Sequence, residues 1–164
     1  MPLRALSLLL FCLVLAACGF QLRGEARLPA VMGSTWLEVS DAGSDFGRDL
    51  ARQLEANGIR VLDAHQDGAA HLKIHREQIR REALTFTGQA RVREFLLIYD
   101  MAFELRDAQG DTLVGPETLQ LTREYSFDEQ EILAAQREQE FLEDDLRRAM
   151  VARLLRRLEA VTES

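Results

Sequence analysis

A positively charged segment between His71 and Arg93 offers the clearest opportunity for binding chemistry in this sequence. Its basic residues outnumber its two acidic residues, Glu77 and Glu82, although the whole chain has a formal net charge of −7. The basic residues are Lys73, Arg76, Arg80, Arg81, Arg91 and Arg93. Arginine can form two parallel hydrogen bonds to one phosphate, so the segment could bind phosphates or another anionic ligand. It could equally be a solvated strand whose charges discourage aggregation at a sheet edge.

Other side chains that could catalyse a reaction or bind a metal do not form a recognisable site. His71 and His75 have a spacing that would suit a metal on a helix, but Leu72 and Ile74 between them indicate a strand. His75 is four positions after His71, so on a strand the two histidines lie about 13 Å apart, which is too far to share one ion. The acidic residues 143–145 are typical of the outer face of an amphipathic helix, and no catalytic or phosphate-loop motif is present. We therefore predict no catalytic site, metal or cofactor.

The N-terminal residues have the layout of a secretory signal peptide. An apolar run follows one positive charge, Arg4, and is shorter than the roughly 20 residues needed to cross a bilayer. It ends in Leu15-Ala16-Ala17-Cys18, which resembles the lipobox of bacterial lipoproteins. This pattern predicts removal of residues 1–17 and lipidation of the Cys18 thiol. An ordinary signal peptide with a cysteine near its cut is the alternative.

The residues that follow the signal peptide are enough for one domain with a sizeable core. Residues 18–33 show no hydrophobic period and are predicted to form a lipidated tether, and residues 34–161 are predicted to form a single domain. Cleavage removes Arg4 and makes the mature chain more acidic, which argues against a nucleic-acid partner. Any site for a polyanion must therefore be local.

The elements that would position these residues begin with a strand, a helix and a second strand. A short strand is predicted at residues 35–40, and Ser44 can then cap a helix that Asn57 and Gly58 end. The apolar residues of this helix recur every four positions: Phe46, Leu50 and Leu54. A strand follows at residues 59–62. A crossover connection of this kind pairs its two strands in parallel.

Three longer strands are predicted next. The alternation of apolar residues in 71–86 shifts its phase before Ile79, which indicates a bulge or a bend. Residues 95–105 keep a period of two throughout, and residues 119–127 also alternate. Pro116 cannot donate a ladder hydrogen bond, so pairing at that position is expected to be weak or absent.

A long helix is predicted at the C-terminus. Asp128 and Glu131 have the spacing of a capping box, which marks a helix start. Apolar residues then recur every four positions: Leu142, Leu146, Met150, Leu154 and Leu158. This apolar face must be covered, and the apolar face of the preceding sheet can cover it. The pattern therefore predicts an α+β fold, a two-layer sandwich with both helices on one side of the sheet.

The order and spacing of three stretches resemble the LptE family of lipopolysaccharide-assembly lipoproteins. The first stretch is Cys18-Gly19-Phe20-Gln21-Leu22-Arg23-Gly24, and the second is the helix end and strand at residues 54–62. The third is Tyr125-Ser126-Phe127-Asp128, which leads into Ala134, Ala135 and the C-terminal helix. The resemblance covers essentially the whole mature chain. It implies two helices packed on one face of a mixed sheet of about four strands.

The resemblance implies a non-enzymatic lipoprotein of the cell outer membrane, anchored by its acyl chains and facing the periplasm and a barrel lumen. Its partner would be the LptD β-barrel, which it would plug and help to assemble for inserting lipopolysaccharide into the outer leaflet. Family members bind lipopolysaccharide through basic residues near a hairpin tip and near the start of the last helix. Here the hairpin offers Arg91, Arg93 and Arg81. On the helix Gln136 stands where a lysine is expected, and the adjacent Arg137 could substitute.

Two other functions stay open on the sequence. An accessory lipoprotein of another envelope lipid-transport complex would have the same lipid tether and a similar small α+β domain. A membrane-anchored periplasmic hydrolase is the remaining candidate, although the sequence supplies no catalytic motif for it.

Overall fold

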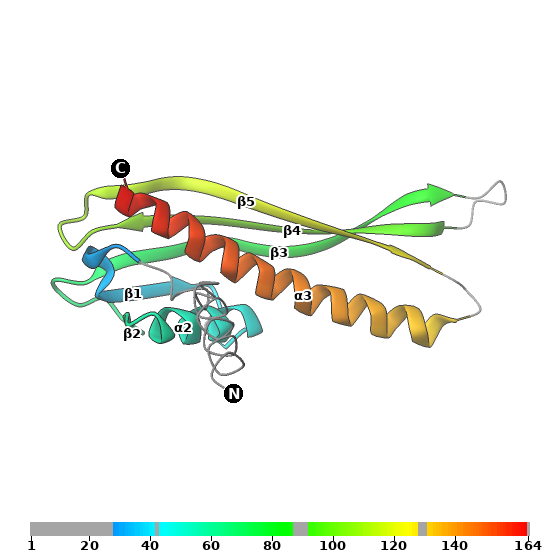
Figure 1. Ribbon diagram of the computed structural model, residues 1–164, viewed down its shortest axis with the longest axis horizontal. Coiled ribbons are helices and arrows are strands. Elements are labelled where there is room, and N and C mark those ends of the chain that lie inside the picture. Colours follow the sequence, from blue (N-terminus) through cyan, green and yellow to red (C-terminus); the bar gives the residue numbers. More distant parts are fainter. Residues whose placement is uncertain (1–27, 42, 87–91, 128–130, 164) are drawn as a thin grey trace, which may run out of the picture.

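The computed structural model describes residues 28–163 except residues 42, 87–91 and 128–130. Figure 1 shows an elongated structure in which helices cover one face of a single sheet, so the predicted two-layer α+β fold is confirmed. The strands are β1 (Ser34–Val39), β2 (Arg60–Leu62), β3 (Ala70–Phe86), β4 (Val92–Arg106) and β5 (Thr112–Ser126). The helices are α2 (Asp45–Ala56) and α3 (Ile132–Glu159), and the short 3-10 turns are η1 (Ala30–Met32) and η2 (Ala160–Glu163).

The five strands form one mixed sheet in the order β2-β1-β3-β4-β5. The family resemblance implied about four strands, whereas the sheet has five, including the three-residue edge strand β2 in the segment 59–62 that the sequence pattern predicted as a strand. β1 pairs in parallel with β2 and β3, and the remaining neighbours are antiparallel. The parallel pairing of the first strand–helix–strand unit is therefore confirmed.

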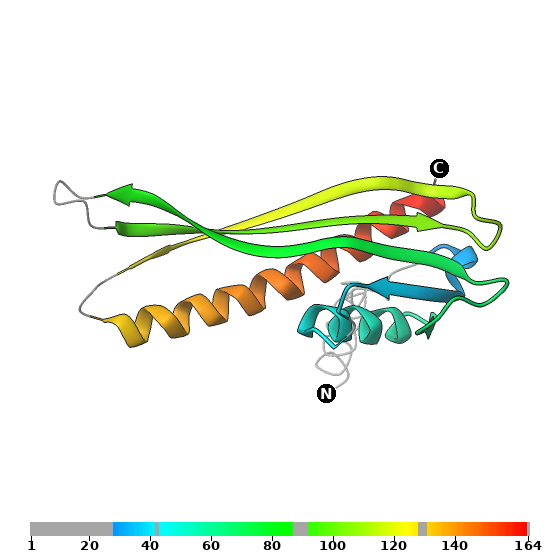
Figure 2. The ribbon, with the colours of Figure 1, turned by 180° about the vertical axis from the view of Figure 1, so that it is seen from behind.

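The sheet is wider at one end than at the other, because β1 pairs only with residues 70–74 of β3. We call the end that contains β1, β2 and α2 the proximal half. The distal half consists of β3 from Arg80 onward with the facing parts of β4 and β5, and α3 covers it. Figure 2 shows the same arrangement from behind, with α3 running along the length of the sheet.

Helix α2 begins and ends where its sequence predicts. The Ser44 Oγ atom accepts a 3.0 Å hydrogen bond from the Gly47 amide, which satisfies one free N–H of the first turn. Gly58, after the C-cap Asn57, has a φ of 81°, a left-handed conformation that glycine adopts without a steric penalty.

Strand β3 contains the predicted irregularity. Ile74 pairs with Phe103 and Arg76 with Ala102, so His75 is an extra residue on β3 with no partner on β4. This bulge exchanges the faces to which odd and even residues of β3 point. Leu72 and Ile74 therefore face the helices before the bulge, and odd-numbered residues face them after it as far as Ala83, where a second register shift leaves Leu84 unpaired.

Strands β4 and β5 follow their alternation closely. The side chains of β4 that lie beneath the helices are Leu97, Tyr99, Met101, Phe103 and Leu105, all completely buried, and the partly buried Phe95. On β5, pairing is continuous from Glu117 to Ser126, but the register shifts before that point and leaves Pro116 without a partner on β4. The expected loss of pairing at Pro116 is confirmed.

Helix α3 begins later than the capping pattern predicts. Its N-cap is Glu131, whose side chain makes no capping hydrogen bond, and the proposed cap Asp128 lies outside the described residues. Its buried stripe matches the prediction from Leu146 to Leu158. Among the described residues, none of the helices combines the length and the hydropathy that a bilayer-spanning helix requires.

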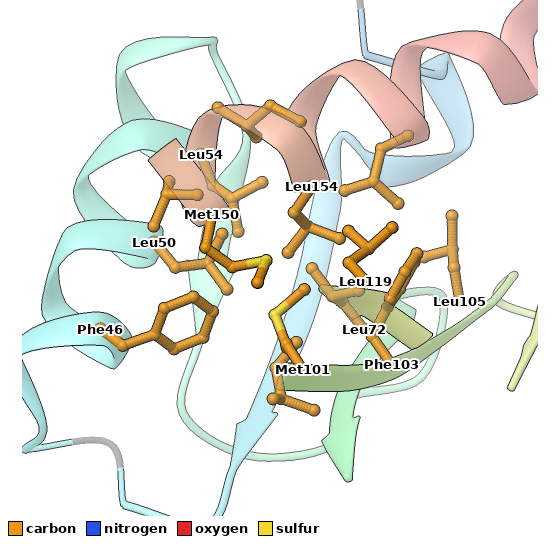
Figure 3. Packing of buried hydrophobic residues seen from close by; sticks show 14 of the residues in the cluster. Phe46, Leu50, Leu54, Leu72, Met101, Phe103, Leu105, Leu119, Met150 and Leu154 are labelled. Carbon is orange, nitrogen blue, oxygen red and sulfur yellow. The ribbon is translucent and has the colours of Figure 1, made fainter. Parts of the chain in front are cut away.

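The hydrophobic core lies between the sheet and the two helices in the proximal half. Figure 3 shows apolar side chains of both helices directed toward those of the strands. The labelled residues come from α2 (Phe46, Leu50, Leu54), α3 (Met150, Leu154) and the sheet (Leu72, Met101, Phe103, Leu105, Leu119). Met32 of η1 is also fully buried in this core, so the fold includes part of the predicted tether.

Candidate functional site

The basic segment lies on β3 and the start of β4, and the sheet divides its residues between two faces. Lys73, Arg76 and Arg80 belong to the face that no helix covers, whereas Arg81 projects toward α3. The bulge at His75 causes this division by changing the phase of the strand. The run of positive charge in the sequence therefore does not become one positive patch.

Lys73 is neutralised by an acidic residue on the neighbouring strand. Its Nζ atom lies 2.7 Å from one carboxylate oxygen of Glu38, and Nε2 of His71 lies 2.7 Å from the other. The hydrogen bond from Lys73 holds the pKa of Glu38 below its ordinary value, and the hydrogen bond with His71 acts in the same direction. Trp36 stacks on the His71 ring with 4.0 Å between centroids. These residues form a cluster of paired charges on the uncovered face of the sheet, where β3 lies between β1 and β4.

Arg80 is engaged in the same way. It forms an ion pair with Asp100, and its Nε atom lies 3.2 Å from Oε1 of Glu82. Gln120 donates a 2.7 Å hydrogen bond to the same Asp100 carboxylate, which is largely buried. Arg76 is exposed and forms no ion pair with another described residue. Arg80 therefore stabilises the folded sheet and is not available for a ligand, because without it Asp100 would be a buried charge without a cation.

Arg81 is held in place by uncharged side chains, and no carboxylate of the described residues neutralises its charge. Its guanidinium carbon lies 4.3 Å from the centre of the Phe95 ring, and its Nη1 atom donates to Oε1 of Gln139 at 3.1 Å. Tyr125 donates a 2.8 Å hydrogen bond to the same oxygen and stacks on Phe95. Phe127 packs edge-on against Phe95 with 5.5 Å between centroids. We call these five residues the Arg81 cluster; it joins β3, β4, the end of β5 and α3.

The Arg81 cluster has the properties of an anion-binding site. No carboxylate of the described residues pairs with Arg81, and the residue is exposed. The aromatic ring and the amide oxygen fix the guanidinium plane, which leaves other N–H groups to bind an acceptor. A phosphate at this position would meet a preorganised cation beside apolar rings.

The remaining predicted hairpin residues lie beyond Arg81 along the distal half. Arg81 pairs with Leu97, and Arg93 is four residues nearer the start of β4, which corresponds to about 13 Å. The Arg93 side chain is not described, and Arg91 lies outside the described residues, as does Cys18. The hairpin nonetheless brings Arg81 and the backbone of Arg93 to the same end of the sheet.

Arg137 does not join the Arg81 cluster. It is exposed on α3, two residues after the buried Ala135 and two residues before Gln139 of the cluster. Two residues correspond to a rotation of about 200° around a helix, so Arg137 points away from the sheet. Gln136 is also exposed. The family pattern would combine Arg137 and the hairpin arginines in one site. Here Arg137 and the Arg81 cluster lie on opposite sides of α3.

Sequence reasoning missed the partners of Arg81. Phe95, Tyr125 and Phe127 were assigned to strands, and nothing in their spacing shows that one arginine would contact them. The register of the β3–β4 hairpin would have revealed the first contact, because Ala83 pairs with Phe95 and places Arg81 diagonally next to it. The contact with Gln139 spans 58 residues and depends on how α3 docks.

Two of the cavities formed by the described residues are lined by α3, and Arg81 lines neither of them. One, of about 620 Å³, lies between the two helices, with Val151 and Leu155 at its floor and Asp49, Arg52 and Arg148 among its lining residues. The other, of about 400 Å³, lies beside the start of α3. Its lining includes three carboxylates, those of Glu94, Glu131 and Glu138, which makes it unsuitable for an anion.

The two histidines considered for metal binding have separate partners. His71 bonds to Glu38, whereas Nε2 of His75 lies 3.6 Å from a carboxylate oxygen of Glu104. Among the described residues, no group of three or more His, Cys, Asp or Glu side chains is arranged to hold a metal ion.

A family model named LptE and described as Lipopolysaccharide-assembly matches residues 28–158 of the chain. The chain is also similar to the LPS-assembly lipoprotein LptE of Photorhabdus laumondii, with 26% identity over 157 residues that cover 94% of this chain and 85% of the relative. The corresponding protein of Pectobacterium atrosepticum is 23% identical over 153 residues, covering 93% of this chain and 82% of the relative.

Solved structures share this fold. The solution structure of an uncharacterized lipoprotein B from Nitrosomonas europaea matches with a TM-score of 0.74 and 30% identity, over 89% of this chain and 94% of that one. The crystal structure of the rare lipoprotein B from Shewanella oneidensis matches in fold with a TM-score of 0.68 and 24% identity, over 77% of this chain and 94% of that one.

Proposed function

The chain belongs to the LptE family of lipopolysaccharide-assembly proteins, and on that premise we propose that it occupies the lumen of the outer-membrane β-barrel LptD. The family match, which spans the described fold from residue 28 to residue 158, is the observation that carries the proposal. In this role the chain assists assembly of the barrel and insertion of lipopolysaccharide into the outer leaflet. It makes and breaks no bond itself.

The surface of the fold suits a plug in a wet lumen. Such a plug needs a rigid interior and a polar exterior where it meets water, because much of the inside of a large membrane barrel is water-filled. The uncovered face of the sheet satisfies its own charges through pairs such as Lys73 with Glu38 and Arg80 with Asp100. It can therefore meet water or polar barrel side chains without leaving buried charges unpaired.

The anchor belongs to the same proposal. We assign residues 1–17 to a signal peptide, Cys18 to the lipidated residue, and residues 34–161, together with the packed residues Leu28 and Met32 that precede them, to one domain. Acyl chains on Cys18 hold the chain on the periplasmic leaflet of the outer membrane, since each buried CH₂ contributes about 0.8 kcal/mol. The fold reaches back to Leu28, which packs against the core, so about ten residues separate the lipid from the folded body.

We assign lipopolysaccharide binding to Arg81 together with Arg91 and Arg93 of the hairpin. Arg81 supports this assignment because its charge is fixed in place and not neutralised. The phosphates of lipopolysaccharide match guanidinium groups, and its acyl chains match apolar rings such as that of Phe95. Arg137 is left out of this site because it faces the opposite side of α3.

Purification of the lipidated chain from its envelope tests the proposal. A one-to-one complex with a heat-modifiable outer-membrane barrel supports it. Co-purification with an inner-membrane ATPase would instead indicate an accessory lipoprotein of another transport complex, and hydrolysis by the isolated chain would indicate an enzyme.

Labelling with radioactive palmitate tests the anchor separately. The wild-type chain and the Cys12→Ser variant should incorporate label, because Cys12 is removed with the signal peptide, whereas Cys18→Ser should not. Label in Cys18→Ser would refute the assignment of the lipidated residue.

A further inference from the structure

The exposed apolar side chains gather at one end of the molecule. Among the described residues, the large apolar side chains with high exposure are Val31, Leu84, Ile132, Leu133 and Phe141. All except Val31 lie in the distal half, on β3 near the hairpin or in the first part of α3. Val31 lies on η1, at the opposite end of Figure 1. Single exposed apolar residues are common on soluble proteins, but a group of them marks an interaction surface.

Leu133, Arg137 and Phe141 form one line along the helix, because residues four apart lie on the same side of an α-helix. We call this line the outer stripe of α3. Leu133 is 72% exposed and Phe141 is 65% exposed, and Arg137 forms no ion pair with another described residue. The opposite side of the helix carries Ala135 and Gln139, which face the sheet. The fold therefore leaves the outer stripe available while α3 stays docked.

We propose that the outer stripe of α3 is the surface by which this chain contacts the wall of its β-barrel partner, an inference that rests on the proposed function. Leu133 and Phe141 pack against apolar side chains that point into the barrel, and Arg137 pairs with a carboxylate of the barrel. The stripe is about 12 Å long, which matches two to three neighbouring strands spaced roughly 4.8 Å apart. Arg137 thus binds the barrel and not lipopolysaccharide.

The charges beside the stripe favour a protein over lipopolysaccharide as its occupant. Glu140, which is exposed and forms no ion pair with another described residue, follows Arg137 by three positions, and Asp144 follows Phe141 by three. Residues three apart on a helix are neighbours, so a phosphate bound at Arg137 would meet the carboxylate of Glu140. Asp144, in contrast, pairs with Arg147. A protein surface can place an acid opposite Arg137 and a base opposite Glu140. Aromatic residues and arginine are also the residue types that contribute most to protein interfaces.

Co-expression of the lipidated full-length chain with the barrel tests the inference. The stripe variant carries Leu133→Asp and Phe141→Asp, and Val31→Asp is the matched control because Val31 is exposed to a similar degree at the other end. All three side chains are exposed, so thermal unfolding midpoints should match that of the wild type. About tenfold less barrel should co-purify with the stripe variant than with the wild type, whereas the control should co-purify with the wild-type amount. Lipopolysaccharide binding by the chain alone should be unchanged in both.

Each contrary result has a distinct meaning. Normal recovery of the barrel by the stripe variant, or equal loss in the Val31→Asp control, overturns the inference while the proposed function stands. Loss of lipopolysaccharide binding in the stripe variant also overturns it, because the stripe would then be a surface that binds lipopolysaccharide. If the wild-type chain recovers no barrel, the proposed function fails and the inference fails with it.

Discussion

Arg81 of β3 and Gln139 of α3 are joined by a 3.1 Å hydrogen bond that ties the helix layer to the distal half of the sheet. The amide oxygen of Gln139 also accepts from Tyr125, and its amide nitrogen donates to Glu143 at 2.7 Å. The position of the guanidinium is therefore set by a side-chain network and not by an opposite charge. An arginine held in this way keeps its charge for a ligand.

Replacing Arg81 with lysine tests whether the planar guanidinium matters beyond its charge. Lysine keeps the charge but loses the stacked plane over Phe95 and the forked hydrogen bonds. Lipopolysaccharide affinity, measured by calorimetry on the soluble domain, should fall roughly fivefold, corresponding to about 1 kcal/mol. Arg153→Lys is the matched control because Arg153 is an exposed arginine elsewhere on α3. Equal affinity in the two variants would argue against a specific role for Arg81.

Replacing Leu154 with alanine tests the core between α3 and the sheet. Leu154 is completely buried in the cluster that Figure 3 shows. The change should lower the free energy of unfolding by about 2–5 kcal/mol, because it removes buried methyl groups and leaves a cavity. Leu133→Ala, at an exposed position of the same helix, should change it by no more than about 0.5 kcal/mol. Urea denaturation measures both, and similar effects would mean that α3 packs differently.

Tyr99 should make the fold sensitive to alkaline pH. Burial, together with a 2.6 Å hydrogen bond to Glu77, raises the pKa of the Tyr99 hydroxyl far above its ordinary value of 10.0. The folded chain therefore keeps a proton that the unfolded chain releases. The contribution of Tyr99 to the free energy of unfolding is fully present below about pH 10 and is lost as pH rises further. Between pH 9 and about pH 11.5 the wild type should lose more unfolding free energy than Tyr99→Phe. Parallel losses in the two proteins would contradict this.

Glu38 should make the stability of the fold sensitive to acidic pH. Its hydrogen bond from Lys73, and then that with His71, lowers its pKa below the ordinary value of 4.5. The stabilisation is therefore present above about pH 4.5 and is lost as pH falls through the lower folded pKa. From about pH 6 to about pH 3, stability should decline more steeply in the wild type than in Lys73→Gln. Thermal unfolding across this range is the measurement, and a steeper decline in the variant would be inconsistent with the pairing.

Much of the fold was predictable because its signals are local. The period of two in residues 95–105 identified the face of β4 that the helices bury, and Ser44 and Gly58 marked the ends of α2 correctly. The start of α3 was less predictable. A capping box contributes only about 1 kcal/mol, and here β5 runs to Ser126 and the helix begins at Ile132 without a side-chain cap.

The candidate site was less predictable because its partners are distant in the sequence. Counting charges along β3 identified a basic segment but could not show that Glu38 neutralises Lys73 or that Asp100 neutralises Arg80. Those acids lie on neighbouring strands, and only the pairing of the strands brings them together. The same limit applies to Arg137, whose direction depends on which side of α3 docks.

The unpaired residue His75 determines which side of the sheet the following residues of β3 occupy, as far as Ala83. If His75 were instead paired with Ala102, the residues of β3 that follow it would move by one step along β4, placing Arg80 beneath the helix and Arg81 on the open side. The same sequence would then present the other arginine of this pair on each surface of the molecule, with composition and net charge unchanged. Sidedness in this part of the protein therefore depends on one residue being left out of the strand pairing.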